Sequence, residues 1–159
     1  MYPQSVDAFS RLWPTGSLVN VCRNPVDWFA SAKRHRPPEY GDLTLALNLW
    51  KLSTQSALDL VKHSSGPRSY IVLFEDLILD TVGVMDELAS RLGIERSPVL
   101  YSPTVGGRPV RSDSSFVSTE GIDESTLDRR SNVSGDQIDY IHRVASDLYE
   151  QAIDAAILH

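Results

Sequence analysis

Two short apolar runs interrupt an otherwise helical pattern of hydrophobic and polar positions. Residues 17–22 (SLVNVC) and 69–74 (SYIVLF) consist mostly of apolar or β-branched side chains, and polar residues follow each run. Runs of this length without strict alternation are typical of strands that are buried on both faces of a parallel sheet. Because helical segments separate the two runs, the pattern predicts a small parallel sheet covered by helices.

Apolar residues at three- and four-residue steps predict the helices, and most of the expected boundaries carry their own signals. The helices are expected at residues 25–35, 42–63 and 81–92 and from residue 135 onward. Asn24 and Asp80 are suitable N-caps, and Gly93 stands where a glycine often ends a helix. Ser134 and Gln137 form a capping-box sequence before the last helix. The first sixteen residues predict only a short amphipathic turn.

This order of elements predicts a single α/β domain over residues 1–159, with a long loop at 97–134 rich in Ser, Gly, Pro, Arg and Asp. A loop of that length in a compact domain is usually functional or disordered. Two parallel strands do not form a stable sheet alone, and their outer edges carry unpaired backbone groups. We therefore expect a further strand, another chain or an additional segment beside them, and a homo-oligomer formed through the sheet edge or helix faces would meet this need.

Charge and composition narrow the classes of partner. The 159 residues are 42% hydrophobic and 23% charged, with a formal net charge of -6 and a pI of about 5.1. An acidic surface disfavours nucleic acid and anionic membranes as partners. One cysteine, Cys22, allows no internal disulfide, and no apolar stretch has the length of a membrane span or the pattern of a signal peptide. These features predict a cytoplasmic protein.

Candidate chemistry lies where the first strand meets the first helix. Arg23 directly follows the apolar run, and the free N–H groups of the helix that follows favour an anion. Ser31 lies about two turns along that helix, roughly 10 Å up its axis, on nearly the same face. An arginine fork and a serine hydroxyl suit a phosphate held beside the helix. Spacing alone leaves a simpler interpretation open, in which Arg23 pairs with a carboxylate and Ser31 only packs.

Four motifs resemble the sulfotransferase family. Residues 22–35 (CRNPVDWFASAKRH) are similar to its segment for the 3'-phosphate of 3'-phosphoadenosine 5'-phosphosulfate, in which an arginine precedes Asp/Asn-Pro and a serine follows eight positions on. Phe74-Glu75-Asp76-Leu77 resembles the family's Tyr-Glu-Asp-Leu stretch, and Trp50 stands where many members carry a tryptophan. Residues 102–116 (SPTVGGRPVRSDSSF) are similar to the late loop of bacterial members. The resemblance implies a partial P-loop-type, three-layer fold with few short parallel strands and mostly helices.

The resemblance also implies roles for individual residues. Arg23 and Ser31 would bind the 3'-phosphate, and Phe74 matches a tyrosine near the adenine, although phenylalanine stacks without donating a hydroxyl hydrogen bond. The late-loop residues that would close over the 3'-phosphate are Gly106, Gly107 and Arg108, with Arg111 as a competing candidate. The family's usual Arg-Lys-Gly sequence is not found there, and a merely solvated connection is the alternative.

Two parts of the family pattern have no counterpart in these 159 residues. One is the glycine-rich loop that binds the 5'-phosphosulfate, and the other is the catalytic base upstream of the 3'-phosphate arginine. No catalytic residue is identified; among the histidines only His35 lies near the expected phosphate site, which makes it the candidate for a base, with a plain surface residue as the alternative. No metal is expected. The chain therefore resembles the C-terminal portion of a sulfotransferase and is expected to be inactive alone.

Three functional hypotheses follow. The first is a sulfotransferase component that binds the nucleotide sulfate donor and serves transfer of a sulfuryl group to an unidentified hydroxyl or amine acceptor. The second is a non-catalytic domain that retains the nucleotide site. The third is a protein-interaction domain whose amphipathic helices bind a partner and in which Arg23 is only structural.

Overall fold

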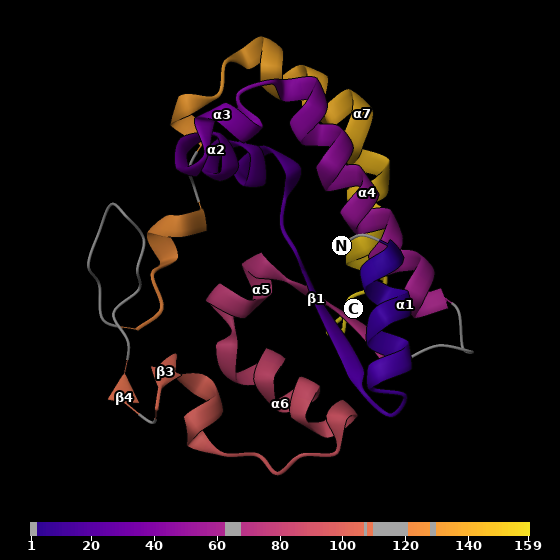
Figure 1. The fold of residues 1–159 in the computed structure, drawn as a ribbon. Coiled ribbons are helices and arrows are strands. Elements are labelled where there is room, and N and C mark those ends of the chain that lie inside the picture. The colour runs from indigo at the N-terminus through magenta and orange to yellow at the C-terminus, as the bar shows by residue number, and fades with distance from the viewer. Residues whose placement is uncertain (1–2, 63–67, 107, 110–120, 128–129) are drawn as a thin grey trace.

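The chain folds into helices arranged around a small parallel sheet (Figure 1). The computed structural model describes residues 3–62, 68–106, 108–109, 121–127 and 130–159. The first half contains α1 (Pro3–Leu12), β1 (Ser17–Cys22), α2 (Pro25–His35), α3 (Pro37–Tyr40), α4 (Leu43–Lys62) and β2 (Arg68–Leu73). The second half contains α5 (Phe74–Leu79), α6 (Thr81–Leu92), β3 (Thr104–Val105), β4 (Arg108–Pro109) and α7 (Gly135–Asp154), with short 3-10 helices at η1 (Pro98–Tyr101), η2 (Glu124–Leu127) and η3 (Arg130–Asn132).

The helix boundaries follow the capping signals of the sequence. The side chain of Asn24 accepts a hydrogen bond from the N–H of Val26 at 3.0 Å, which satisfies one free donor at the start of α2. Asp80 caps α6 in the same way, and Gly93 ends that helix with a φ of 72°. Ser134 and Gln137 form a reciprocal capping box at the start of α7. The predicted starts of these three helices are confirmed.

β1 and β2 pair in parallel, as the apolar runs predict. The register runs from Ser17 opposite Arg68 to Cys22 opposite Leu73, so the two strands end together. On the far side of β2, the N–H of Ile157 donates to the carbonyl of Ile71 at 3.0 Å, and the segment after α7 thus covers part of that edge. Within the described residues no strand lies beside the outer edge of β1.

The main core lies on one face of this sheet, against α2, α4 and α7. Its largest fully buried side chains, with no more than 2% of their surface exposed, are Val26, Phe29, Leu47, Leu58, Ile71 and Ile141. Figure 1 shows α4 and α7 running side by side, and the core side chains come from both of them. Most of the apolar burial in the described chain is on this face, so we expect it to supply most of the stability.

The opposite face is only partly covered. A second cluster packs α6 against β2, with Val72, Val84 and Leu88 buried in it. β1 has no such cover, and Val19 and Val21 are 39% and 56% exposed. The prediction that both strands are buried on both faces is therefore wrong for β1. The physical reason is that α6 packs on the half of the sheet formed by β2.

Three further segments differ from the sequence-based prediction or extend it. The N-terminal turn is a ten-residue helix, α1. Phe74, assigned above to the end of the second strand, begins α5, so strand and helix meet without a linker. The described part of 97–134 holds the short elements η1, β3, β4, η2 and η3. Across the described residues, no helix is both long and apolar enough to cross a membrane.

Two leucines of α4 test where the stability comes from. Leu58→Ala removes a fully buried side chain and should lower the free energy of unfolding by about 2–5 kcal/mol, because it leaves a cavity in the main core. Leu52→Ala is the matched control, since that side chain is 43% exposed on the same helix. We expect the control to lose less than about 1 kcal/mol in urea unfolding followed by circular dichroism. Equal losses in the two variants would contradict this assignment of the core.

Candidate functional site

The shared end of the two strands brings Arg23 and Phe74 together. The ladder stops at the pair Cys22 and Leu73, so the next residue of each strand leaves the same edge of the sheet. The carbon at the centre of the Arg23 guanidinium lies 4.5 Å from the centroid of the Phe74 ring, a cation–π arrangement. Two residues that came from motifs 51 positions apart thus form one surface at the carboxyl edge of a parallel sheet, where α/β folds bind ligands.

Arg23 has a second neighbour that the sequence did not predict. Its Nη2 donates to the backbone carbonyl of Thr126 in η2, 103 residues further along the chain. A guanidinium carries five N–H donors in one plane, and stacking on a ring uses none of them. No sequence pattern could have identified Thr126, because the contact uses a backbone oxygen that every residue carries.

The first turn of α2 contains a buried carboxylate with its own cation. Only 2% of the Asp27 surface is exposed, and Arg130 Nη2 lies 3.3 Å from Asp27 Oδ2. Because burying a carboxylate without a cation is costly, Arg130 stabilises the buried Asp27. The pair connects η3 to α2. It also offsets a negative charge close to the point where an anion is expected, which favours anion binding there.

The other residues predicted on α2 lie further along it. Ser31 is partly exposed, and the contacts described above for the Arg23 side chain lie toward α5 and η2. His35 is exposed at the last position of α2, about 15 Å from the first at 1.5 Å per residue. The structure therefore brings Arg23 to Phe74 rather than to His35, and the pairing of Arg23 with Ser31 stays a prediction.

The late-loop candidates are distributed differently. Gly106 has a φ of 59°, a left-handed conformation that favours glycine, and Arg108 is exposed in β4. β3 and β4 pair antiparallel at the periphery of the molecule in Figure 1. Gly107 and Arg111 lie outside the described residues.

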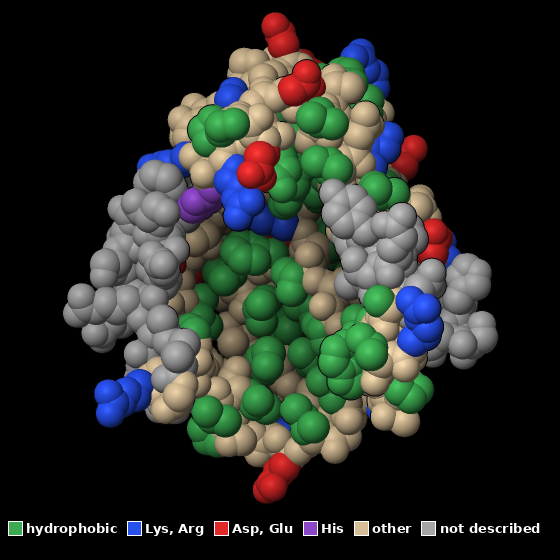
Figure 2. Space-filling model, viewed as in Figure 1, with side chains coloured by type: hydrophobic (Ala, Val, Ile, Leu, Met, Phe, Trp, Pro, Cys, Tyr) green, Lys and Arg blue, Asp and Glu red, His purple; other side chains and the backbone are tan. Residues whose placement is uncertain are grey.

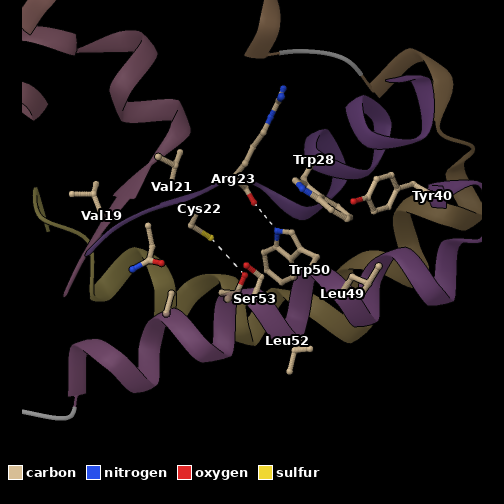
Figure 3. Close-up of a pocket in the computed structure, with 13 residues that line it drawn as sticks. Val19, Val21, Cys22, Arg23, Trp28, Tyr40, Leu49, Trp50, Leu52 and Ser53 are labelled. Atoms are coloured by element: carbon tan, nitrogen blue, oxygen red, sulfur yellow. Dashed lines mark hydrogen bonds between the residues drawn. The ribbon is translucent and has the colours of Figure 1, made fainter. Parts of the chain in front are cut away.

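A cleft of about 450 Å³ follows the open edge of β1 (Figure 3). It runs between the strand and α4, and Arg23 stands at one end of it. The rings of Trp28 and Tyr40 form part of its wall and meet edge to face, with their centroids 5.6 Å apart. Trp50 also lines the cleft, but only 4% of its surface is exposed. Figure 2 shows hydrophobic side chains lining the hollow on this side of the molecule. Trp50 therefore packs mainly in the core, whereas the partly buried Trp28 contributes ring surface to the wall of the cleft.

A second cavity, of about 380 Å³, lies on the side of the sheet formed by α5 and α6. Phe74, Met85, Tyr101 and Thr126 are among the residues that line it, and the lining is mostly apolar. Phe74 and Thr126 are also the two contacts of Arg23 described above. The guanidinium and this cavity are therefore neighbours, a cation beside a space that can hold a flat apolar group.

Comparison with protein-family models, with curated proteins and with solved structures finds no match to this chain. In the part of the chain that the structure describes, no group of three or more His, Cys, Asp or Glu side chains is arranged to hold a metal ion.

Cys22 directly precedes Arg23, and the reactivity of its thiol measures how well this end of β1 is buried. Burial raises the pKa of the Cys22 thiol to about 11, although a contact with Thr54 at 3.9 Å lowers it slightly. A rise of two units from the ordinary value of 9.0 leaves about a hundredfold less thiolate at pH 8. Iodoacetamide should therefore alkylate the native chain at least about a hundredfold more slowly than the urea-unfolded chain.

The same shift predicts a loss of stability at alkaline pH. The unfolded thiol ionises near pH 9 and the native thiol near 11, so the unfolded state loses its proton first as the pH rises. Unfolding should become easier across that interval, and Cys22→Ala should remove this part of the pH dependence. Rapid alkylation of the native chain, or an unchanged pH profile in the variant, would show that the thiol is accessible.

Proposed function

We propose that this chain binds the 3'-phosphate of 3'-phosphoadenosine 5'-phosphosulfate through Arg23, as a component of a sulfotransferase with a P-loop-type fold. The observation that carries the proposal is the stacking of Arg23 on Phe74 at the carboxyl edge of the parallel strands. The two residues belong to separate motifs of one resemblance, which assigns them to the phosphate and to the adenine of one nucleotide.

Charge and shape support a nucleotide over a simple anion. The guanidinium offers planar donors matched to phosphate oxygens, and the start of α2 adds the positive end of a helix dipole. Beside Phe74, the apolar cavity of about 380 Å³ has the size and lining expected for a nucleobase and ribose. A phosphate at Arg23 and a base beside Phe74 would lie a few ångströms apart, as they do in one nucleotide.

The proposed chemistry transfers a sulfuryl group. The bond between sulfur and the bridging oxygen of the donor breaks, a bond forms between sulfur and an acceptor hydroxyl or amine, and the acceptor gives up its proton to a base. Such a step needs an oriented nucleophile and cationic stabilisation of the leaving phosphate. The 159 residues contain no glycine-rich phosphate loop, and His35 lies at the far end of α2. We therefore expect nucleotide binding, without turnover, from this polypeptide alone.

Calorimetric titration with 3'-phosphoadenosine 5'-phosphate tests the proposal, with adenosine 5'-phosphate as the ligand that lacks the 3' group. The first should bind about 10–100-fold more tightly, since a charge-assisted contact contributes about 1.5–3 kcal/mol. Arg23→Ala should abolish this preference, and Arg23→Lys should restore only part of it, because lysine lacks the planar fork.

The matched control is Arg36→Ala. It removes the same charge from an exposed residue at the opposite end of α2, where Arg36 pairs with Glu39 at 3.2 Å, and it should leave both affinities unchanged. Equal affinity of the wild type for the two nucleotides would overturn the proposal. A preference that survives Arg23→Ala would assign the phosphate to another residue.

Turnover separates the proposed component of a transferase from a purely nucleotide-binding domain. If the chain binds its donor but gains no activity when supplied with any polypeptide that carries a glycine-rich phosphate loop, the non-catalytic alternative is favoured. If neither nucleotide binds and Arg23→Ala changes nothing but stability, the interaction-domain alternative is favoured.

A further inference from the structure

One peptide group at the strand-to-helix junction is held from both ends by side chains. The carbonyl oxygen of Arg23 accepts a hydrogen bond from Trp50 Nε1 at 3.1 Å, shown as a dashed line in Figure 3. The N–H of the same peptide, which belongs to Asn24, donates to Glu75 Oε1 at 2.9 Å. Trp50 comes from α4 and Glu75 from α5, so two different elements fix the orientation of this single peptide plane.

We call Trp50 and Glu75, with their two hydrogen bonds to the Arg23–Asn24 peptide, the clamp. A residue of the last helix supports it. The other carboxylate oxygen of Glu75, Oε2, accepts a hydrogen bond from the hydroxyl of Tyr149 in α7 at 3.1 Å. Burial, followed by the neighbouring Glu75 charge, raises the pKa of Tyr149, so its hydroxyl keeps its proton and remains a donor. The rings of Tyr149 and Trp50 lie 6.4 Å apart in the main core. Both ends of the clamp therefore rest on well-packed aromatic side chains.

The clamped peptide determines where Arg23 points. β1 ends at Cys22 and α2 begins at Pro25, so the Arg23–Asn24 peptide lies between the two elements, where Glu75 holds its N–H and Trp50 holds its carbonyl. The proposed site has two sources of positive charge, the Arg23 guanidinium and the N-terminal end of α2. Rotation of this peptide would change the direction of one relative to the other. Hydrogen bonds at both ends of the peptide oppose that rotation.

We propose that Trp50, Glu75 and Tyr149 are positioning residues that hold the Arg23–Asn24 peptide so that Arg23 and the start of α2 face one phosphate group. This inference rests on the proposed function. It gives Glu75 a role opposite to that expected from its charge. A carboxylate near an anion site weakens binding by repulsion, so its presence there is accounted for by the hydrogen bonds it accepts.

Substitutions at Glu75 separate the repulsion of the anion from the positioning of the peptide, because the two effects change the nucleotide affinity in opposite directions. Glu75→Gln removes the charge but keeps an oxygen that can accept from Asn24 and an amide that can pair with Tyr149. It should bind 3'-phosphoadenosine 5'-phosphate as tightly as the wild type or more tightly. Glu75→Ala removes both hydrogen bonds and should weaken that binding about tenfold, with little change for adenosine 5'-phosphate. A purely electrostatic role predicts tighter binding in both variants.

The other two positions are tested through the same ratio of affinities. Tyr149→Phe and Trp50→Phe each remove one hydrogen bond and keep an aromatic ring, so each should lower the preference for the 3'-phosphorylated nucleotide about two- to tenfold. Tyr140→Phe is the matched control for Tyr149, because Tyr140 is half-buried on the same helix and packs against the same core. It should leave the ratio unchanged. A ratio is used because a general loss of stability lowers both affinities together.

The outcomes distinguish this inference from the proposed function. If the wild type does not discriminate between the two nucleotides, the proposed function fails and this inference fails with it. If the wild type discriminates and Glu75→Ala, Tyr149→Phe and Trp50→Phe keep that discrimination, only the positioning role is overturned. Loss in Glu75→Ala with recovery in Glu75→Gln is the result that supports it.

Discussion

The common end of β1 and β2 is the constraint on which the candidate site depends. Parallel strands in this register send their next residues out at one edge, so Arg23 and Phe74 become neighbours although 51 positions separate them. The following residues, Asn24 and Glu75, are then also within hydrogen-bonding distance. A shift of one residue in the register would separate both pairs and exchange the faces of a whole strand. The main core opposes such a shift, because Ile71 and Leu73 are buried in it.

The uneven cover of the sheet explains which side of the molecule carries most of the packing. Parallel strands are ordinarily covered on both faces, yet here β1 is packed on only one of them. Two strands contribute little stability by themselves, so the packing of α2, α4 and α7 on the covered face stabilises the sheet. Arg23 lies at the boundary between the covered face of the sheet and the exposed part of β1. Trp50 from the covered side holds its backbone carbonyl, and Arg23 also lines one end of the cleft beside β1.

The sequence predicted what depends on neighbours along the chain. Caps such as Asn24, the helical periods and the parallel pairing of the two apolar runs required no knowledge of distant contacts. Only the resemblance brought Arg23 and Phe74 together in advance, because it assigns both to one nucleotide, and their direct contact depends on the register of the two strands. The contacts of Arg23 with Thr126 and of Asp27 with Arg130 could not, since each spans 103 positions and involves a backbone atom or an unremarkable charged residue. The exposure of Val21 was also missed, because an apolar run does not reveal how far a covering helix extends.

The polar groups of Trp50 and Tyr149 satisfy hydrogen bonds that the junction between β1 and α2 requires. A peptide that belongs to neither a strand nor a helix needs one donor and one acceptor from elsewhere if water does not reach it. Trp50 supplies the donor from a side chain that is otherwise apolar, and Glu75 supplies the acceptor. The carboxylate in turn needs a donor, which Tyr149 provides from within the core. Phenylalanine would keep an aromatic ring at either position but would leave one of these groups without its partner. The packing that stabilises the fold thus also sets the geometry of the site.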